Sequence, residues 1–582
     1  MRWGYRARSF SLLCSISVLL GLLALTLAGC NQQRASTAST PAPTPASDAQ
    51  QVLHIALGHS IGTLDPAVQL DPESSGMLAL VWPTLVALDA QQQPRPWAAQ
   101  RIDISPDGLT YTFHLYKGLT WSDGTPLGAQ DFAYSLNRLL DPCTDSHLGY
   151  DLYSLKDAVA FNTETCESVS GSSETLSGSI NTLLNNAITV TDPQTLVVKL
   201  QQPSAYFLTA LSAPACAAVP QQLIAHYGSQ WTSHLATGVG FGANLFLVTA
   251  WDSKHGLTLQ RNPHFWGKKP LLRELDLTFE KSDAVAYSNF LSGQSDIGYA
   301  PLAQYGQASA KKDFHAVGNL TEDYFAMNWR IAPFNDERMR QAFALALDKE
   351  TLIEQVFHGT AQPTNHIVPQ GVPGYNAALT GPDGTQTLKG NVVKAQQLEQ
   401  SYIHDVCSGQ VSQCPAVTLT VASGYPTQAS LAQAAVTMWK AAFPGYPVSS
   451  ATIDDGTFLD DLLGNVTAPT LQFWATFWVG DYPDPQDWLS LQFLPTSAYN
   501  SSSVNLSDAN ALMIRADGEP DVAQRMLDYQ RAEQMLVTQV AWIPLDQEEV
   551  WWESAPYVTN YALTTTEQTP LSVWQQVYIA RH

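Results

Sequence analysis

The spacing of apolar residues changes repeatedly along the chain between a strand-like and a helix-like period. Residues 51–57 are typical of a short strand that enters a glycine-rich turn, and residues 109–115 alternate between apolar and polar side chains, as in a strand with one buried face. Between Asp336 and Leu347, apolar residues recur every four positions, which predicts an amphipathic helix capped by Asn335 or Asp336. Because such elements alternate without a repeat period, the pattern favours α/β or α+β lobes over a solenoid or a barrel.

Three further patterns extend this picture. Asp348 is placed to cap a second helix with apolar positions at Leu352, Val356 and Phe357. Near the C-terminus, a set of apolar residues shares one predicted helix face: Val522, Met526, Tyr529, Leu536 and Val540. Residues 143–186 hold two cysteines among many Ser, Thr, Gly, Asn and Glu residues, and this composition predicts a surface insertion.

The first thirty residues have the pattern of an export signal. Three arginines within the first eight residues precede an uncharged stretch from Ser9 to Gly29, which is the layout of a signal peptide. The stretch ends in Leu-Ala-Gly-Cys30, and this ending resembles the lipobox of bacterial lipoproteins, in which the cysteine becomes the lipidated first residue. The alternative is a retained transmembrane anchor, since about 20 apolar residues can span a bilayer. The resemblance implies a protein that is exported and held by a lipid on Cys30 at the extracytoplasmic face of the cell membrane.

Composition limits both structure and function. Residues 30–50 contain no large apolar side chain, so burial cannot offset their ordering entropy and we expect a flexible stalk. A chain of 582 residues is too long for one ordinary core, and two or three domains are expected. The formal net charge is −23, and loss of residues 1–29 with their three arginines would make it −26. Such an acidic chain lacks the positive surface that binds phosphate backbones, which excludes nucleic acid as a partner.

The cysteines fit export to an oxidising compartment. Five remain apart from Cys14 and Cys30, so at least one stays unpaired. Proximity along the chain suggests Cys143 with Cys166 and Cys407 with Cys414, although sequence cannot decide the connectivity. Cys216 would then remain as a buried free thiol.

No catalytic or metal centre stands out. Ser60 lies in a Gly-His-Ser-Ile-Gly segment that matches the nucleophile elbow of serine hydrolases, but a Thr-Leu-Asp-Pro turn follows where the elbow needs a helix. Cys407 and Cys414 lack a second ligand pair at zinc spacing, and the acidic residues at 454–461 lack the spacing of a calcium loop. We therefore expect no metal and no cofactor, and an anchored hydrolase using Ser60 remains a less favoured alternative.

Several blocks of sequence, in a fixed order, resemble the family 5 extracellular solute-binding proteins of ABC importers, the oligopeptide- and dipeptide-binding group. The matching blocks are residues 63–66 (TLDP), 105–115 (SPDGLTYTFHL), 121–127 (WSDGTPL), 131–135 (DFAYS), 260–266 (QRNPHFW), 291–297 (LSGQSDI) and 332–342 (APFNDERMRQA). Most of these blocks also read as turns or core segments, so the resemblance identifies the family without marking binding residues.

The resemblance implies an α/β fold of the periplasmic-binding-protein type II (cluster C), with two lobes, a hinge and an extra domain. The implied division is residues 1–29 as signal, 30–50 as stalk, 51–80 with 205–318 and 549–582 as lobe I, 81–204 as the extra domain II, and 319–548 as lobe III. Ligand would be enclosed by hinge closure near residues 318 and 548. The implied partners are a peptide, the permease and ATPase subunits of an importer, and the membrane through the lipid anchor, with the protein itself monomeric.

One block points to the ligand. Residues 477–485 (FWVGDYPDP) look like the segment of oligopeptide-binding proteins in which an aspartate pairs with the α-ammonium of the ligand, and Asp481 occupies that position. The resemblance implies that the backbone of Phe477, Trp478 and Val479 pairs with an extended ligand as an added strand, with Tyr482 alongside. Residues that match the ligand-facing loop near the N-terminus are Glu73, Ser74 and Ser75.

The chain also departs from the family pattern. Peptide binders with a defined length preference place an arginine where this chain has Ala475, and a second basic position falls in residues 462–464, which are Leu-Leu-Gly. Relatives in this family carry nickel chelates, haem, opines or oligosaccharides. A set of aromatic residues here would suit either sugar or peptide: Trp474, Phe477, Trp478, Tyr482 and Trp488. A non-peptide solute such as an oligosaccharide or a metal chelate is therefore the alternative ligand.

Overall fold

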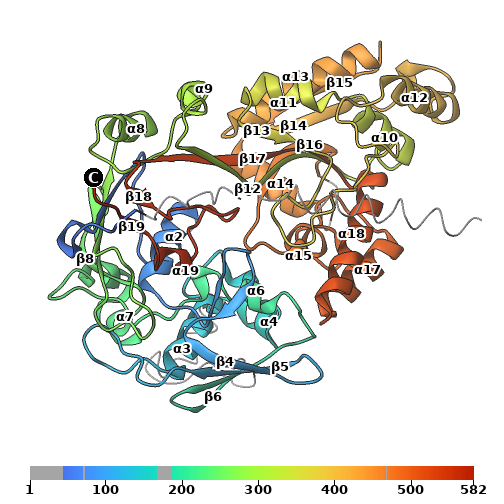
Figure 1. The fold of residues 1–582 in the computed structure, drawn as a ribbon. Helices are drawn as coiled ribbons and strands as arrows, with labels where there is room; N and C mark the ends of the chain where they lie inside the picture. The colour runs from blue at the N-terminus through green and yellow to red at the C-terminus, as the bar shows by residue number, and fades with distance from the viewer. Residues whose placement is uncertain (1–42, 70–71, 167–186, 467, 469) are drawn as a thin grey trace, which may run out of the picture. The chain divides into compact units, whose positions relative to one another are not determined.

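The computed structural model describes residues 43–69, 72–166, 187–466, 468 and 470–582, and residues 45–582 form one unit. Eleven strands of this part of the chain build one mixed sheet (Figure 1). Their order is β15 (Val448–Ile453), β14 (Val417–Ala422), β16 (Phe473–Val479), β12 (Phe314–Met327), β17 (Trp542–Ser554), β11 (Ile297–Gly298), β1 (Val52–Leu57), β10 (Glu274–Phe279), β9 (Gly256–Arg261) and β8 (Phe246–Asp252), with β13 (Ala361–Pro363) paired to β17.

The two long strands β12 and β17 connect the two ends of this sheet. They pair antiparallel, and one end of β17 bonds to β11 while the other end of β12 bonds to β16. The register shifts between Gly318 and Glu322, beside positions 318 and 548, where the sequence predicts the lobes to be joined. A break in the ladder is a local weak point at which two rigid bodies can bend relative to each other.

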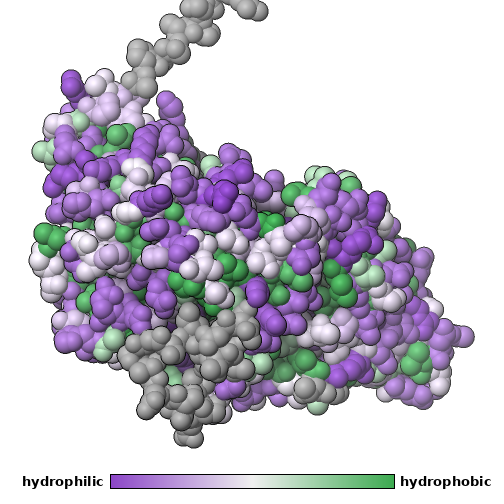
Figure 2. Space-filling view, turned by 90° about the horizontal axis from the view of Figure 1, so that it is seen from below, coloured by the Kyte–Doolittle hydropathy of each residue, from purple (hydrophilic) through white to green (hydrophobic). Residues whose placement is uncertain are grey.

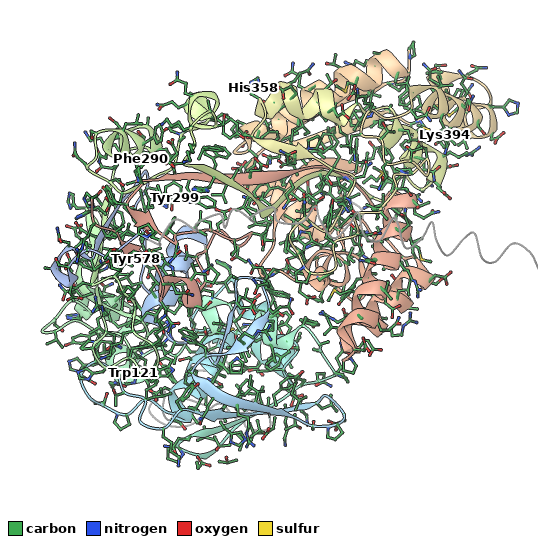
Figure 3. All side chains as sticks on the ribbon, in the orientation of Figure 1. Trp121, Phe290, Tyr299, His358, Lys394 and Tyr578 are labelled. Carbon is green, nitrogen blue, oxygen red and sulfur yellow. A yellow bond between two sulfur atoms is a disulfide. The ribbon has the colours of Figure 1, made fainter. Side chains whose placement is uncertain are left out.

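Apolar side chains form separate cores on the two sides of this crossover. The first core draws on residues 53–297 and 571–579 and includes Trp82, Trp121 and Trp231. Two others draw on residues 320–545 and include Trp439 and Trp488. Figure 3 shows Trp121 near one end of the unit, with His358 and Lys394 in the opposite part. We call the part of the unit that holds the first core the first lobe, and the part that holds the other two the second lobe.

A second sheet belongs to the predicted extra domain. In the described residues it has four strands, in the order β4 (Ala99–Ile104), β5 (Thr110–Leu115), β7 (Thr195–Lys199) and β6 (Ile188–Asp192). Strand β5 shows the predicted alternation of buried and half-buried residues. Helix α3 (Ala129–Leu140) packs on this sheet, and its apolar face belongs to the first core. Residues 81–204 and the first lobe therefore share one continuous core. A short pair, β2 (Val86–Leu88) with β3 (Pro94–Pro96), precedes it.

The remaining elements are helices and two short strands near the C-terminus. Those on the side of the first core are α2 (Pro72–Val81), α4 (Ala158–Asn162), α6 (Phe207–Ala210), α7 (Gln221–Tyr227), α8 (Asp283–Leu291), α9 (Tyr305–Ala308) and α19 (Leu571–Trp574), with β18 (Val558–Thr559) and β19 (Tyr578–Ile579). Those between residues 319 and 548 are α10 (Glu337–Leu345), α11 (Lys349–Phe357), α12 (Val392–Val406), α13 (Pro426–Ala442), α14 (Asp455–Gly464), α15 (Pro485–Trp488), α16 (Ser490–Phe493), α17 (Ser507–Gly518) and α18 (Val522–Thr538). No helix among the described residues is long and apolar enough to cross a membrane.

Helix boundaries follow the predicted caps. Asp336 accepts a hydrogen bond from the backbone of Arg338 at the start of α10, and Asp348 accepts one from Thr351 at the start of α11. The prediction for the last long helix was partly wrong. Val540 lies beyond the end of α18, and Val522 is 62% exposed. The buried face of α18 instead includes charged residues that a search for apolar spacing passes over.

Residues 143–166 correct the prediction of a plain surface insertion. A 3-10 turn, η2 (Gly149–Leu152), and helix α4 place Leu152, Leu155 and Phe161 in the first core with no exposed surface. The polar composition of the segment concealed these few apolar anchors. The rest of the predicted insertion, residues 167–186, lies outside the described residues.

The disulfides are Cys143–Cys166 and Cys407–Cys414, the two pairings suggested by proximity, and Cys216 is a buried free cysteine. The first bond closes a loop over residues 143–166, and the second closes a loop over residues 407–414. Burial raises the pKa of the Cys216 thiol well above its usual value, so this thiol is an unreactive core residue.

The predicted stalk is folded over its last six residues. The amide of Ala46 donates to the carbonyl of Ile579 at 2.8 Å, and Asp48 forms a 2.8 Å ion pair with Arg261. Residues 45–50 thus dock on the C-terminal segment because their backbone groups find partners there, which composition does not reveal. The predicted signal peptide and the predicted lipidation site Cys30 lie outside the described residues. The face of the unit in Figure 2 is largely hydrophilic, with hydrophobic residues in small groups.

Candidate ligand-binding cleft

Strand β16 leads into the segment that the sequence singled out. The strand pairs with β12 along its whole length, but its other edge is paired with β14 only at Phe473 and Trp474. Within the described residues, no strand bonds to that edge over residues 475–479. The exposed N–H and C=O groups of such an edge are a template for an added strand.

Asp481 follows this edge and is held in a defined position. Tyr150 Oη donates a 2.8 Å hydrogen bond to Asp481 Oδ1, and the Asp481 amide donates to Asp487 Oδ2 at 3.1 Å. Asp481 Oδ2 is buried and has no hydrogen-bond partner in the described structure. Burial raises the pKa of Asp481 to about 6, while the Tyr150 hydrogen bond acts to lower it. The carboxylate is therefore ionised at neutral pH and has one oxygen available for a cation.

The local sequence explains this placement. Asp484 caps α15 by accepting from the Gln486 amide, and both of its oxygens bind the guanidinium of Arg525 on α18 at 2.8 and 2.5 Å. Gly480 is required because an added Cβ would lie 2.2 Å from the ring of Trp488. The tight turn and the ion pair together aim Asp481 away from the core.

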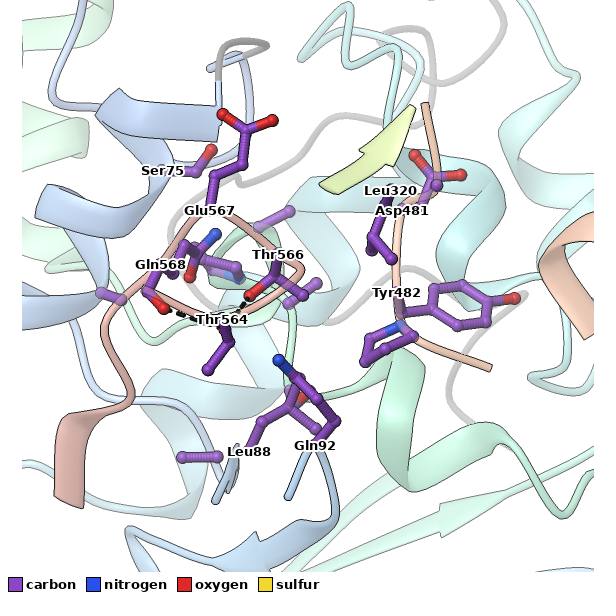
Figure 4. A pocket seen from close by; sticks show the side chains of 18 of the residues that line it. Ser75, Leu88, Gln92, Leu320, Asp481, Tyr482, Thr564, Thr566, Glu567 and Gln568 are labelled. Carbon is purple, nitrogen blue, oxygen red and sulfur yellow. Dashed lines mark hydrogen bonds between the residues drawn. The ribbon is translucent and has the colours of Figure 1, made fainter. Parts of the chain in front are cut away.

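Two cavities meet at the end of β16. The first has a volume of about 180 Å³ and is lined by Ser75, Val479, Asp481 and Tyr482, together with Asp151 and residues 564–571. Figure 4 shows Asp481 and Glu567 on different segments that border this space. The second has a volume of about 750 Å³ and is lined by residues of both lobes and of the crossover strands, among them Phe477, Val479 and Trp551. Val479 and Glu567 line both cavities, which therefore adjoin, and we refer to the two together as the cleft.

The predicted site residues take different places in this cleft. Ser75, Val479, Asp481 and Tyr482 line the first cavity and Phe477 lines the second. The indole of Trp478 lines neither. It donates to Asp487 Oδ2 at 3.0 Å and packs on Tyr499 at 5.6 Å, which supports the Asp481 turn from behind. The side chains of Glu73 and Ser74 lie outside the described residues.

Several positions considered as departures from the family pattern or as stacking aromatics are buried and do not face the cleft. Ala475 is only 3% exposed and belongs to the core of the second lobe, so this position does not face the cleft. Two of the aromatic residues considered for sugar stacking, Trp474 and Trp488, are buried at 1% and 0% exposure. Phe477 packs edge-on against Tyr425 at 5.2 Å. Aromatic stacking surfaces are thus fewer than the sequence suggested.

The cleft has a one-sided charge. Among the described residues, its acidic lining residues are Asp151, Asp283, Asp481, Glu548, Glu549 and Glu567, and it is lined by no Lys or Arg. Sequence reasoning missed Asp151, Tyr150 and the 564–571 loop. A cleft lined in this way favours a cationic group on the ligand.

The structure does not support the hydrolase and metal sites that were considered from the sequence. Ser60 is exposed in a loop after β1, and the next helix, α2, begins twelve residues later at Pro72, so the helix that a nucleophile elbow requires is missing. Asp454 caps α14 by accepting from Thr457, as expected for a helix start. In the part of the chain that the structure describes, no cluster of His, Cys, Asp or Glu could hold a metal ion.

The sequence is similar to those of a known protein family. The family model for bacterial extracellular solute-binding proteins, family 5 (middle part), matches residues 93–500. The oligopeptide-binding protein OppA of Bacillus subtilis is 26% identical over 91% of this chain and 93% of its own length. The probable deoxycholate-binding periplasmic protein YgiS of Escherichia coli is 26% identical over 94% of this chain and 96% of its own.

The fold has solved counterparts. The periplasmic murein tripeptide binding protein MppA, in its unliganded open form, aligns with a TM-score of 0.74 at 23% identity, over 93% of this chain and 99% of its own. The fold is therefore that of the two-lobed type II binding proteins. The chain belongs to the family 5 bacterial extracellular solute-binding proteins.

Proposed function

We propose that the protein is the substrate-binding receptor of an ABC importer, which captures peptides between its lobes and delivers them to a membrane permease. The observation that carries this proposal is the combination of an unpaired strand edge at residues 475–479 with Asp481 immediately after it. An extended peptide presents matching groups in the same order, namely main-chain amides and a terminal ammonium.

Physical chemistry gives each part a role. The edge of β16 pairs with main-chain groups, so it holds a peptide without reading its side chains. Asp481 pairs with the α-ammonium, because a buried ammonium needs an ionised partner to offset its lost hydration. Ser75, Phe477, Val479 and Tyr482 line the space around the peptide.

The setting of the receptor follows from the same proposal. Lipidation at Cys30 holds the protein at the extracytoplasmic face of the membrane, where it works as a monomer with the permease and ATPase subunits. Hinge closure around the ligand changes the surface offered to the permease. The protein performs no chemistry on the ligand and needs no cofactor.

The test compares free and N-acetylated peptides on protein freed of ligand by unfolding and refolding. Calorimetric titration should show that acetylation weakens binding by about 2–5 kcal/mol, the usual scale for unpairing a buried charge. The Asp481→Asn variant should bind both forms with similar, weaker affinity. Equal affinity of the wild type for both forms would overturn the anchor.

A non-peptide ligand, such as an oligosaccharide or a metal chelate, is the second candidate, supported by a relative named for binding deoxycholate. Deoxycholate is an anion, and the acidic lining of this cleft opposes an anion. Mass spectrometry of ligand that co-purifies with the protein separates these candidates directly. A serine hydrolase is tested by ester turnover, which Ser60→Ala would abolish; turnover equal in both proteins, or absent from both, removes that idea.

A further inference from the structure

A second carboxylate lies in the first cavity beside the proposed ammonium anchor. Asp151 lines the cavity together with Asp481, although it comes from the segment 81–204 and Asp481 from the second lobe. Tyr150 sets the approach of these segments, because its hydroxyl bonds to Asp481 at 2.8 Å while the next residue in the chain is Asp151. The turn η2 that carries both is fixed by Leu152, which is fully buried in the first core.

The Asp151 carboxylate is short of partners. The residue is only 5% exposed, and its Oδ1 has no hydrogen-bond partner among the described residues. Burial raises the pKa of Asp151 well above its usual value, and the negative charge of Asp481 raises it further. Leaving a buried carboxylate oxygen without a partner costs free energy, and no Lys or Arg among the described lining residues offsets it.

The side-chain amide of Gln92 also lacks hydrogen-bond partners. Gln92 also lines the first cavity, is 6% exposed, and has no partner in the described structure for either Oε1 or Nε2. The third carboxylate nearby, Asp487, differs from these groups. It does not line the cavity; its Oδ2 accepts from Trp478 and from the Asp481 amide, and its Oδ1 has no partner in the described structure. Among the described lining residues, the buried side-chain polar atoms without a partner belong to Asp151, Asp481, Gln92, Thr565 and Thr569. Of these residues, only Asp151 and Asp481 carry carboxylates.

We propose that Asp151 and Asp481 form a two-carboxylate subsite that selects peptides whose first residue is lysine or arginine. The inference rests on the proposed function: Asp481 takes the α-ammonium, Asp151 takes the side-chain cation of the same residue, and the Gln92 carbonyl accepts from that cation. Two buried carboxylates so close to each other cannot both stay ionised at low cost unless two positive charges accompany them. A peptide with a neutral first residue supplies only one.

The experiment uses refolded, ligand-free protein and three synthetic peptides. Lys-Ala-Ala-Ala carries the second cation on its first residue. Norleucine-Ala-Ala-Ala has a side chain of nearly the same shape without the charge. Ala-Ala-Ala-Lys has the same net charge as the first peptide but places the cation elsewhere. Wild type should bind the first peptide at least tenfold more tightly than either of the others.

Variants then assign the preference. Asp151→Asn should reduce the lysine-over-norleucine preference to within about twofold, while affinity for the norleucine peptide changes little. Glu549→Gln removes a carboxylate from the second cavity and serves as the matched control, in which the preference should persist. Near-ultraviolet circular dichroism checks that both variants are folded.

The outcomes are separable. A wild type that binds all three peptides equally overturns the two-carboxylate subsite and leaves peptide capture standing, and this comparison needs no variant. Loss of the preference in Glu549→Gln but not in Asp151→Asn would also overturn it, since the preference would then reflect the general charge of the cleft. If none of the three peptides binds to the wild type, both the proposed function and this inference are overturned.

Discussion

The hydroxyl of Tyr150 donates a hydrogen bond of 2.8 Å to the carboxylate of Asp481. These residues lie 331 positions apart and on different sides of the crossover strands. The contact links the segment 81–204 to the second lobe at the point where the proposed ammonium anchor sits. It also sets the charge state of that anchor, because the hydrogen bond favours the ionised carboxylate.

The pH dependence of peptide binding should report on this contact. With an Asp481 pKa of about 6, affinity should fall as the pH drops through 6, because the carboxylate is neutralised while the peptide ammonium stays protonated. Tyr150→Phe removes a donor to the ionised form, so the midpoint should move upward by about half to one pH unit. Calorimetric titrations between pH 4.5 and 7.5 measure both midpoints.

Tyr499→Phe is the control for that shift. The Tyr499 ring packs edge-on against the Tyr150 ring at 5.6 Å, but among the described residues the hydrogen bond to the Asp481 carboxylate comes from Tyr150 and not from Tyr499. Its midpoint should match the wild type. A Tyr150→Phe midpoint that stays in place would show that the hydrogen bond does not tune the anchor.

Stability of the ligand-free protein should show the opposite trend. Because burial raises the pKa of Asp481 from 3.8 to about 6, the stability contributed by its protonated form is fully present below pH 4 and is lost as the pH rises through 6. Asparagine does not ionise, so the Asp481→Asn variant does not lose this stability as the pH rises. At pH 7.5 the ligand-free variant should be more stable than the wild type by about 1–3 kcal/mol.

Thermal unfolding of both proteins at pH 4 and pH 7.5 measures this difference. At pH 4 the two melting temperatures should nearly coincide, since the wild-type carboxylate is protonated there. An Asn variant that melts below the wild type at pH 7.5 would contradict the prediction. Stabilisation together with weakened peptide binding would identify Asp481 as a residue kept for function at a cost in stability.

The ion pair between Arg525 and Asp484 should be a main support of the anchor turn. Both side chains are almost fully buried, at 6% and 5% exposure, and bond through two oxygens. Arg525→Met leaves the Asp484 charge buried without its partner and should cost about 3–5 kcal/mol in urea unfolding. Arg515→Met is the comparison, because the Arg515 side chain is 52% exposed and its buried partner Asp528 keeps its contacts with Gln524 at 3.0 Å and Arg531 at 3.7 Å. Loss of Arg515 should therefore cost much less. Equal costs for the two variants would contradict a special role for the buried pair.

A pair of acids at the crossover strands gives a further prediction. Asp323 on β12 lies directly opposite Asp546 on β17, both are fully buried, and neither oxygen of Asp546 has a partner in the described structure. Burial and the charge of Glu548 raise the pKa of Asp323 to about 7. Burial and the Asp323 charge also raise the pKa of Asp546. The stability from protonation is present below pH 4 and is lost as the pH rises through 7.

Asp546→Asn should therefore stabilise the protein at pH 8 by about 1–4 kcal/mol, because it removes one of two facing buried charges and adds an amide that can donate to Asp323. The gain should disappear near pH 4. Urea unfolding at the two pH values measures it, and Gln547→Glu, which adds a buried charge at the neighbouring position, should be less stable than wild type at pH 8. Destabilisation by Asp546→Asn at pH 8 would contradict the prediction.

Much of the fold was predictable because the family motifs are structural. Asp65 in the TLDP turn accepts hydrogen bonds from Arg138 at 2.9 and 2.6 Å and from the Trp231 indole at 3.0 Å. This one aspartate ties the turn to helix α3 and to the 3-10 helix at Gly228–His234 that contains Trp231. The strand at residues 52–57 and the capped helices at 337–357 follow from local periodicity and capping, which depend on near neighbours in the sequence.

The candidate site was only partly predictable. Asp481 has a local motif around it, whereas Asp151 lies in a polar segment with no pattern of its own. The charged residues on the buried face of α18 were missed for a similar reason. Arg525 is buried because Asp484, 41 positions earlier, meets it. Pairings of this kind depend on tertiary contacts, and residue spacing along one helix does not encode them.

The free edge of β16 has a consequence for the empty receptor. Exposed strand edges invite pairing between copies of a protein, and exported proteins work without intracellular chaperones. Here the edge lies at residues 475–479, and Phe477 and Val479 line the space between the lobes. The unpaired edge thus borders the cleft. An edge that borders the cleft is less open to pairing between ligand-free copies than one on an outer face would be.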